Sequence, residues 1–239
     1  MREKIFNRTL FCLCAVIMAC GTAANAQSPA SSPAGGPIAQ AGGKIASGPY
    51  QGKAPMAPMA APDAVDAVIY SNLTVDTCTG CNYSSQNGYF ILGPSNCFAP
   101  GATQWIAYPF VAGRTQAVTR VSLSITDYGV CVSTSKRFTV AIYTDNCANV
   151  PDTQIGLSVI AQAPAAPCAL ASANFGAAGV SVAAGTKYWV VVTTSTAPTQ
   201  MGTTAVWWMA NSAYAPFNLN DGNGWINFPD GAPGGFQVQ

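Results

Sequence analysis

Few residue types in this chain can do chemistry, because it contains no histidine. Its one glutamate, Glu3, lies in an N-terminal segment that we expect to be removed on export. Serine and cysteine triads that use histidine, histidine-ligated zinc and imidazole acid–base catalysis are therefore excluded. A glycosidase needs two carboxyl groups at a set separation. The remaining aspartates lie mostly in turn-like contexts, so we expect neither enzymatic activity nor a cofactor.

The cysteines are expected to be structural. Six of the nine remain after removal of the N-terminal segment: Cys78, Cys81, Cys97, Cys131, Cys147 and Cys168. An even number in an oxidising compartment is typical of disulfides, so we expect no free thiol. The pair Cys78 and Cys81 has the spacing of a redox dithiol or half a zinc site, but no helix start and no second close pair accompany it. Sequence alone does not choose the pairing; Cys147 and Cys168, which bracket one loop-like stretch, are the favoured pair.

The segment 145–152 contains three candidate metal ligands. Asp145, Asn149 and Asp152 offer carboxylate and amide oxygens of the kind that calcium accepts. Aspartate and asparagine also hydrogen-bond to their own backbone, so a turn is the preferred interpretation. The segment 221–224, Asp-Gly-Asn-Gly, resembles a fragment of a calcium loop but lacks the later ligands, and we interpret it as a turn too.

The C-terminal stretch offers a candidate ligand-binding site. Its predicted residues are Trp207, Trp208, Tyr214, Asn218, Asp221, Asn223 and Trp225. Aromatic rings beside amides and carboxylates suit a ligand that pairs apolar faces with hydroxyl groups, as sugars do. The alternative is that several of these rings close one end of the hydrophobic core. Exposure of the tryptophans would separate the two interpretations.

The charge balance argues against nucleic acid as a partner. Removing Arg2, Lys4, Arg8 and Glu3 from ten basic and nine acidic residues leaves seven and eight, a mature net charge of about −1. No cluster of basic residues that could neutralise phosphates is present. The expected partner is therefore a glycan or a surface protein.

Residues 1–26 have the pattern of a secretory signal peptide. Basic residues come first, an apolar run over residues 10–20 follows, and Ala24-Asn25-Ala26 supplies the small residues of a cleavage site. The apolar run covers about half of the roughly 20 residues that a membrane helix needs, and no later segment is apolar enough to span. We expect cleavage after Ala26 and a secreted or cell-surface protein. The alternative is a lipid anchor on Cys20, in a sequence where Met18 fits the lipoprotein motif poorly.

Two regions follow the signal peptide. Residues 27–67 are mostly Ala, Pro, Gly, Ser and Gln, which cannot bury enough surface to offset chain entropy, so they are predicted to form a disordered tether. Residues 68–239 are predicted to form one β-sandwich domain.

Alternation with a period of two is the main structural signal in residues 68–239. Val121, Leu123 and Ile125 share one face, and Phe138, Val140 and Ile142 repeat the pattern. Other expected strands cover residues 104–110, 155–161, 178–182, 187–194, 204–210 and 236–239, and residues 188–192 are apolar on both faces, as in a central strand. No amphipathic helix is expected. The fold class is all-β, an antiparallel two-sheet sandwich of jelly-roll type.

The same residues carry a family resemblance. Residues 104–110 (Gln-Trp-Ile-Ala-Tyr-Pro-Phe), 118–121, 140–145 with Val150-Pro151, and 184–192 occur in this order. As an ordered set they resemble the choice-of-anchor type of bacterial exported β-sandwich domain, over residues 97–239. The resemblance implies export and the sandwich fold, and it implies no established activity.

Together these features predict an exported, non-enzymatic β-sandwich module for surface or extracellular interaction. A more specific form of this prediction is carbohydrate binding through the C-terminal aromatic and asparagine cluster. An inert structural protein of an envelope or matrix layer is the third possibility.

Overall fold

Strands and turns make up the described chain. The computed structural model describes residues 46–47, 67–75, 80–84, 87–96, 101–127, 136–166, 168–194, 204–210 and 215–239, all within the unit Gly35–Gln239. These residues contain no helix, which confirms the all-β prediction. The predicted signal peptide lies outside them, as does most of the predicted tether. One short strand, β1 (Ala46–Ser47), falls inside the tether and pairs with β3 (Gly88–Leu92).

The largest sheet has six strands in the order β15-β14-β4-β12-β8-β9, and every neighbouring pair is antiparallel. Its strands are β4 (Trp105–Val111), β8 (Arg137–Asp145), β9 (Pro151–Gln162), β12 (Lys187–Thr193), β14 (Ala215–Asn220) and β15 (Trp225–Gly231). In β12 the residues from Tyr188 to Val192 are all buried, as expected for a strand enclosed on both faces.

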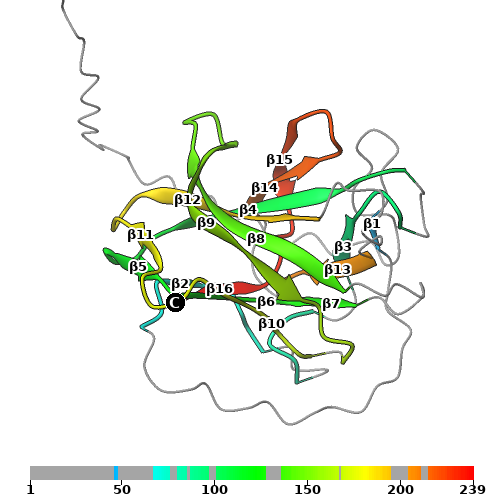
Figure 1. Cartoon of the computed structure of the whole chain (residues 1–239), viewed down its shortest axis with the longest axis horizontal. Helices are drawn as coiled ribbons and strands as arrows, with labels where there is room; N and C mark the ends of the chain where they lie inside the picture. The colour runs from blue at the N-terminus through cyan, green and yellow to red at the C-terminus, as the bar shows by residue number, and fades with distance from the viewer. Residues whose placement is uncertain are drawn as a thin grey trace, which may run out of the picture. The chain divides into compact units, whose positions relative to one another are not determined.

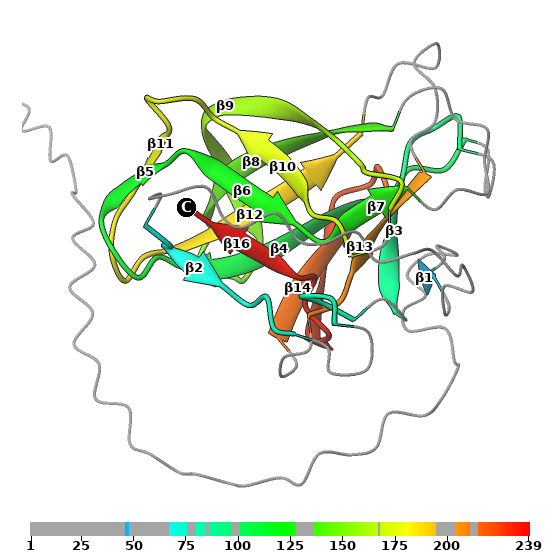
Figure 2. The same ribbon diagram turned by 90° about the horizontal axis from the view of Figure 1, so that it is seen from below.

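Three smaller sheets complete the described fold. One has the order β10-β6-β16-β2, a second β1-β3-β13-β7, and a third joins β11 to β5. Their strands are β2 (Tyr70–Ser71), β5 (Gln116–Val118), β6 (Arg120–Leu123), β7 (Ile125–Asp127), β10 (Ala171–Asn174), β11 (Val180–Val182), β13 (Thr204–Trp208) and β16 (Phe236–Val238). Figures 1 and 2 show β6 and β16 in one layer and β4 and β12 in the other.

The main core lies between these layers and follows the predicted alternation. Val121 and Leu123 of β6 and Phe138, Val140 and Ile142 of β8 are all buried in it. Its centre is aromatic: the ring of Tyr108 lies 4.7 Å from that of Trp207 in an edge-on arrangement and 5.6 Å from that of Phe217. Such pairs contribute beyond their buried area. The sheets therefore pack face to face, as a β-sandwich does.

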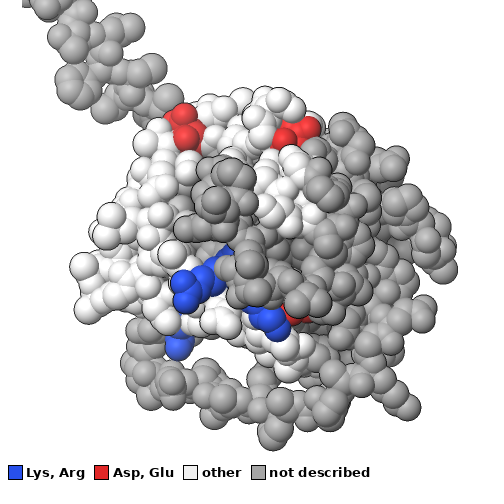
Figure 3. Space-filling model, turned by 45° about the vertical axis from the view of Figure 1, so that its right-hand side comes forward, with Lys and Arg blue, Asp and Glu red and all other residues white. Residues whose placement is uncertain are grey.

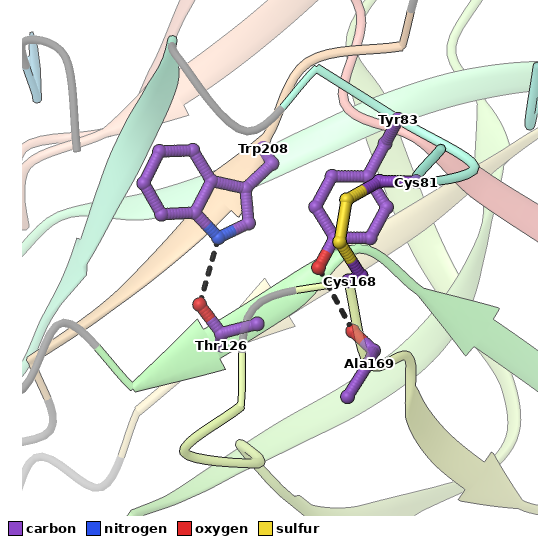
Figure 4. Close-up of a disulfide and its surroundings, with 6 residues drawn as sticks. All are labelled: Cys81, Tyr83, Thr126, Cys168, Ala169 and Trp208. Atoms are coloured by element: carbon purple, nitrogen blue, oxygen red, sulfur yellow. Dashed lines mark hydrogen bonds between the residues drawn. A yellow bond between two sulfur atoms is a disulfide. The ribbon is translucent and has the colours of Figure 1, made fainter. Parts of the chain in front are cut away.

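A second cluster covers the opposite face of β3 and β13. Tyr83, Phe90, Leu92, Val206 and Trp208 are buried together there. The indole nitrogen of Trp208 donates to the hydroxyl of Thr126 at 2.7 Å, and the hydroxyl of Tyr83 donates to the carbonyl of Ala169 at 3.1 Å (Figure 4). Ser124 and Thr126 are also buried here, and the hydroxyl of Ser124 donates to the carbonyl of Trp208 at 2.6 Å.

A disulfide between Cys81 and Cys168 borders this second cluster (Figure 4). Both cysteines were expected in disulfides, but the favoured pair Cys147 and Cys168 is wrong. The twelve residues of β9 lie between those two positions, and a strand of that length spans about 40 Å. Cys147 is instead an exposed free thiol, so the expectation that every cysteine is paired is also wrong. Cys78, Cys97 and Cys131 lie outside the described residues.

The buried tyrosines predict alkaline sensitivity. Burial raises the pKa of Tyr83, and that of Tyr108, above the ordinary value of 10.0. Above pH 10.0 the unfolded chain loses tyrosine protons that the folded chain keeps, so the free energy of unfolding falls as the pH rises through this range. Urea midpoints measured below and above pH 10.0 should show the fall, and Tyr83→Phe should make it shallower. A midpoint independent of pH would show that these hydroxyls titrate alike in both states.

Candidate functional site

Two of the predicted ligand-binding rings belong to cores. Trp207 has no exposed surface and Trp208 only 2%. The indole nitrogen of Trp207 donates to the carbonyl of Gly235 at 3.0 Å inside the main core, while Trp208 lies in the second cluster. Consecutive residues of a strand point to opposite faces, and here both faces of β13 are covered. The prediction that these two tryptophans contact a ligand is wrong.

Four other predicted residues lie on the β14–β15 hairpin: Asn218, Asp221, Asn223 and Trp225. Asp221 accepts a hydrogen bond from the backbone of Asn223 at 3.1 Å, which confirms the predicted turn. Trp225 is partly exposed, Asn223 is exposed and Asn218 is fully buried. Tyr214 lies outside the described residues. The hairpin therefore carries four of the predicted ligand-binding residues, whereas Trp207 and Trp208 of β13 are no longer candidates.

The register of β14 assembles a site that includes residues the sequence interpretation missed. Asn220 pairs with Trp225 on one side and with Trp105 of β4 on the other. Directly paired residues project from the same face of a sheet. Phe217 and Leu219 of β14 point into the core, so Asn218 and Asn220 point outward. We call Trp105, Asn220 and Trp225 the tryptophan row. It lies on the outer face of the six-stranded sheet.

The tryptophan row is partly exposed and held in place. Trp105 and Trp225 are both half-buried, and Asn220 between them is 9% exposed. The indole nitrogen of Trp105 donates to the hydroxyl of Thr194 at 3.2 Å, and the side-chain oxygen of Asn220 accepts from the backbone of Gly222 at 2.8 Å. Two aromatic faces with an amide between them can receive a ligand that has both apolar and hydroxyl surfaces.

The loop that joins β8 to β9 closes the neighbouring part of this face. The carbonyl of Asn149 accepts hydrogen bonds from the side chains of Asn218 and Asn227, each at 2.9 Å. The loop therefore reaches across the sheet as far as β14 and β15. A small cluster of Ala107, Trp189 and Val191 is buried on this face, with Tyr143 and Trp225 packed against it. On the side of the loop that carries the tryptophan row, Trp105 and Trp225 are partly exposed.

A lysine occupies the predicted metal site. The ammonium group of Lys187 hydrogen-bonds to the side-chain oxygen of Asn149 and lies 3.2 Å from a carboxylate oxygen of Asp145. It also lies 4.7 Å from the centre of the Trp189 ring, whose nitrogen donates to the same carboxylate oxygen at 2.8 Å. Asp152 accepts from the hydroxyl of Thr153 instead. The weak calcium prediction is therefore contradicted, because the cation among these oxygens belongs to the chain itself.

The turn interpretation of the same loop is confirmed. The carboxylate of Asp145 accepts from the backbone of Cys147 at 3.1 Å, and the side-chain oxygen of Asn146 accepts from the backbone of Ala148 at 2.8 Å. Cys147 and Asn149 have positive φ angles of 66° and 60°. Among the described residues, no group of three or more acidic or cysteine side chains is placed to hold a metal ion.

One buried acceptor lies next to the tryptophan row. The side-chain oxygen of Asn218 is buried and has no hydrogen-bond partner among the described residues. An unpartnered buried acceptor costs about 1 to 3 kcal/mol. A donor supplied by a buried water molecule would therefore be favourable here.

Charge is sparse on the described surface. Figure 3 shows one face of the molecule, where most of the described residues are uncharged. Two of the aspartates are held by lysines: Asp127 lies 2.8 Å from Lys136, and Asp145 pairs with Lys187. Nowhere in the described ranges is there a helix with the length and apolarity of a membrane span.

Comparison with protein-family models finds no match to this chain, and comparison with curated proteins finds none either. The resemblance to choice-of-anchor domains therefore stays a prediction.

Proposed function

We propose that the mature chain is an exported, non-enzymatic interaction module that binds carbohydrate through the tryptophan row. The observation that carries the proposal is the placement of Trp105 and Trp225 on both sides of Asn220, on the partly exposed outer face of the six-stranded sheet. The row keeps Trp225 from the predicted ligand-binding residues and adds Trp105 and Asn220.

Export is supported by two independent features. The sequence of residues 1–26 has the order of a signal peptide. The disulfide between Cys81 and Cys168 fits an extracellular protein, since disulfides persist in oxidising compartments.

Carbohydrate is favoured over a protein partner by the chemistry of the row. A sugar presents an apolar ring face to an indole and hydroxyl groups to an amide, and the row offers both within one strand spacing of each other. The hydrogen bond from Trp105 to Thr194 fixes the orientation of one ring before a ligand arrives. Such preorganisation reduces the entropy lost on binding.

A non-enzymatic role is supported by the state of the carboxylates. Asp145 accepts from Trp189 and pairs with Lys187, and Asp127 pairs with Lys136. Asp221 stabilises the β14–β15 turn. The carboxylates of Asp127, Asp145 and Asp221 therefore each make a structural contact, and none of these three residues belongs to the tryptophan row.

Replacing Trp225 by alanine tests the proposal. Trp225→Ala should weaken retention on a polysaccharide array by about tenfold or more, since a ring contact of about 1.4 kcal/mol corresponds to one decade in affinity. The midpoint of thermal unfolding should change little, because the ring is half-buried at the surface. Trp225→Tyr, which keeps an aromatic face, should retain most of the binding.

Ile226→Ala is the matched control. Ile226 is the next residue of β15, is 40% exposed and lies on the opposite face of the strand. It should leave retention unchanged. Equal losses in both variants, or a wild type that binds no polysaccharide on the array, would rule out the carbohydrate function and leave the general interaction module.

A further inference from the structure

The tryptophan row continues across the whole six-stranded sheet. Thr193 of β12 pairs with Thr139 of β8, and Thr139 pairs with Ile160 of β9. Val192 pairs with Ile106, so Thr193 and Trp105 stand side by side one position further along. We call the resulting line the extended row: Trp225, Asn220, Trp105, Thr193, Thr139 and Ile160. Five steps of about 4.8 Å between six strands make it about 24 Å long.

Five of the six residues of the extended row reach the solvent, and the sixth, Asn220, is buried at 9% exposed. Trp225, Trp105, Thr193 and Thr139 are all partly exposed. Ile160 at the far end is 69% exposed. The adjacent line of outward residues is closed: Asn218, Ala107, Val191 and Ala141 are buried. The β8–β9 loop, fixed to Asn218 and Asn227, borders the row on that side.

The extended row combines apolar and hydrogen-bonding side chains, and none of its six residues is charged. Its apolar surfaces are Trp225, Trp105 and Ile160, and its polar groups are one amide and two hydroxyls. Arginine and lysine are the residues that recognise carboxylate and sulfate groups. Their absence from the row argues against an acidic ligand, and the length of the row argues against a single sugar.

We infer that the ligand of this face is a neutral, extended polysaccharide chain that lies across the strands from Trp225 to Ile160. This inference rests on the proposed carbohydrate function and names its substrate class. A pyranose residue in an extended chain advances by about one strand spacing, so consecutive sugars can meet consecutive strands.

The test is a length series with the purified mature protein. Calorimetry with neutral β-1,4-linked glucose and N-acetylglucosamine oligosaccharides, from the disaccharide to the hexasaccharide, should show affinity rising by about tenfold or more in at least one series. Binding should change little with salt, since no ion pair forms. Ile160→Ala should lower hexasaccharide affinity by about threefold to tenfold, through lost apolar contact, and leave disaccharide affinity unchanged.

Leu157→Ala is the matched control for Ile160→Ala. Leu157 lies on the same strand and is 81% exposed, but it stands in the irregular stretch between Ile155 and Val159, off the extended row. The Leu157→Ala variant should bind both oligosaccharides as the wild type does.

Three results would overturn the inference: affinity that does not rise beyond the disaccharide, an Ile160→Ala variant that binds as the wild type does, or tighter and salt-sensitive binding of an acidic polysaccharide. If Trp225→Ala still weakened retention on the array by about tenfold or more, the proposed carbohydrate function would stand without this inference. A wild type that bound neither the array nor the oligosaccharides would remove both.

Discussion

Trp207→Ala is expected to destabilise the domain by about 3 to 5 kcal/mol, because it leaves a large cavity in the main core. The ring of Trp207 has no exposed surface and contacts the rings of Tyr108 and Phe236, with centres 4.7 and 6.0 Å away. The variant also leaves the carbonyl of Gly235 without its indole donor. Domains of this size are stable by about 5 to 15 kcal/mol, so the change removes a large share of the total.

Urea unfolding followed by circular dichroism measures this loss. Trp225→Ala serves as the control, since the same ring is deleted at a half-buried surface position and the midpoint should move little. Similar midpoints for the two alanine variants would contradict the assignment of Trp207 to the core.

Removal of the Cys81 and Cys168 disulfide is expected to cost about 4 to 5 kcal/mol. The bond closes a loop of 87 positions, and the loss of chain entropy in the unfolded state grows with loop length. The double variant Cys81→Ser, Cys168→Ser should therefore unfold at a much lower urea concentration. It should also loosen the second cluster first, because Tyr83 is close in sequence to Cys81 and its hydroxyl bonds to the neighbour of Cys168.

Cys147→Ser is the control for the disulfide variant. Its thiol is exposed and free, so its replacement should leave the urea midpoint unchanged. Peptide mapping without reduction should recover Cys81 linked to Cys168 and Cys147 reactive toward a thiol reagent. A Cys147→Ser variant as unstable as the double variant would show that the pairing is different in solution.

The sandwich could be predicted because its signal is local. Alternation in residues 120–125 and 137–143 follows directly from the period of a strand, and β6, β8 and β12 lie where the pattern put them. Strands β14 and β15 were not expected, although Phe217 and Leu219 alternate there with Asn218 and Asn220. Their asparagines and glycines were interpreted as loop and ligand residues instead.

The candidate site was harder to predict, because pairing between distant strands creates it. Trp105 and Trp225 are 120 positions apart and meet only through Asn220. Lys187 reaches Asp145 through the pairing of β12 with β8. One error was avoidable: Trp207 and Trp208 are consecutive residues of a predicted strand, so they could not share a binding face. The pairing of Cys81 with Cys168 depends on tertiary structure and has no local signal.

The shape of β9 bears on whether two copies of the domain can join at their sheet edges. It is the terminal strand of the six-stranded sheet, with no charged residue after Asp152 and with Leu157 and Ile160 exposed. A flat strand of this kind would template the addition of another chain. Its pairing is interrupted between Val140 and Ile142 of β8, opposite Gly156, whose φ is +68°. The interruption bends the strand, so β9 is a poorer template for edge-to-edge addition than a flat strand of the same length.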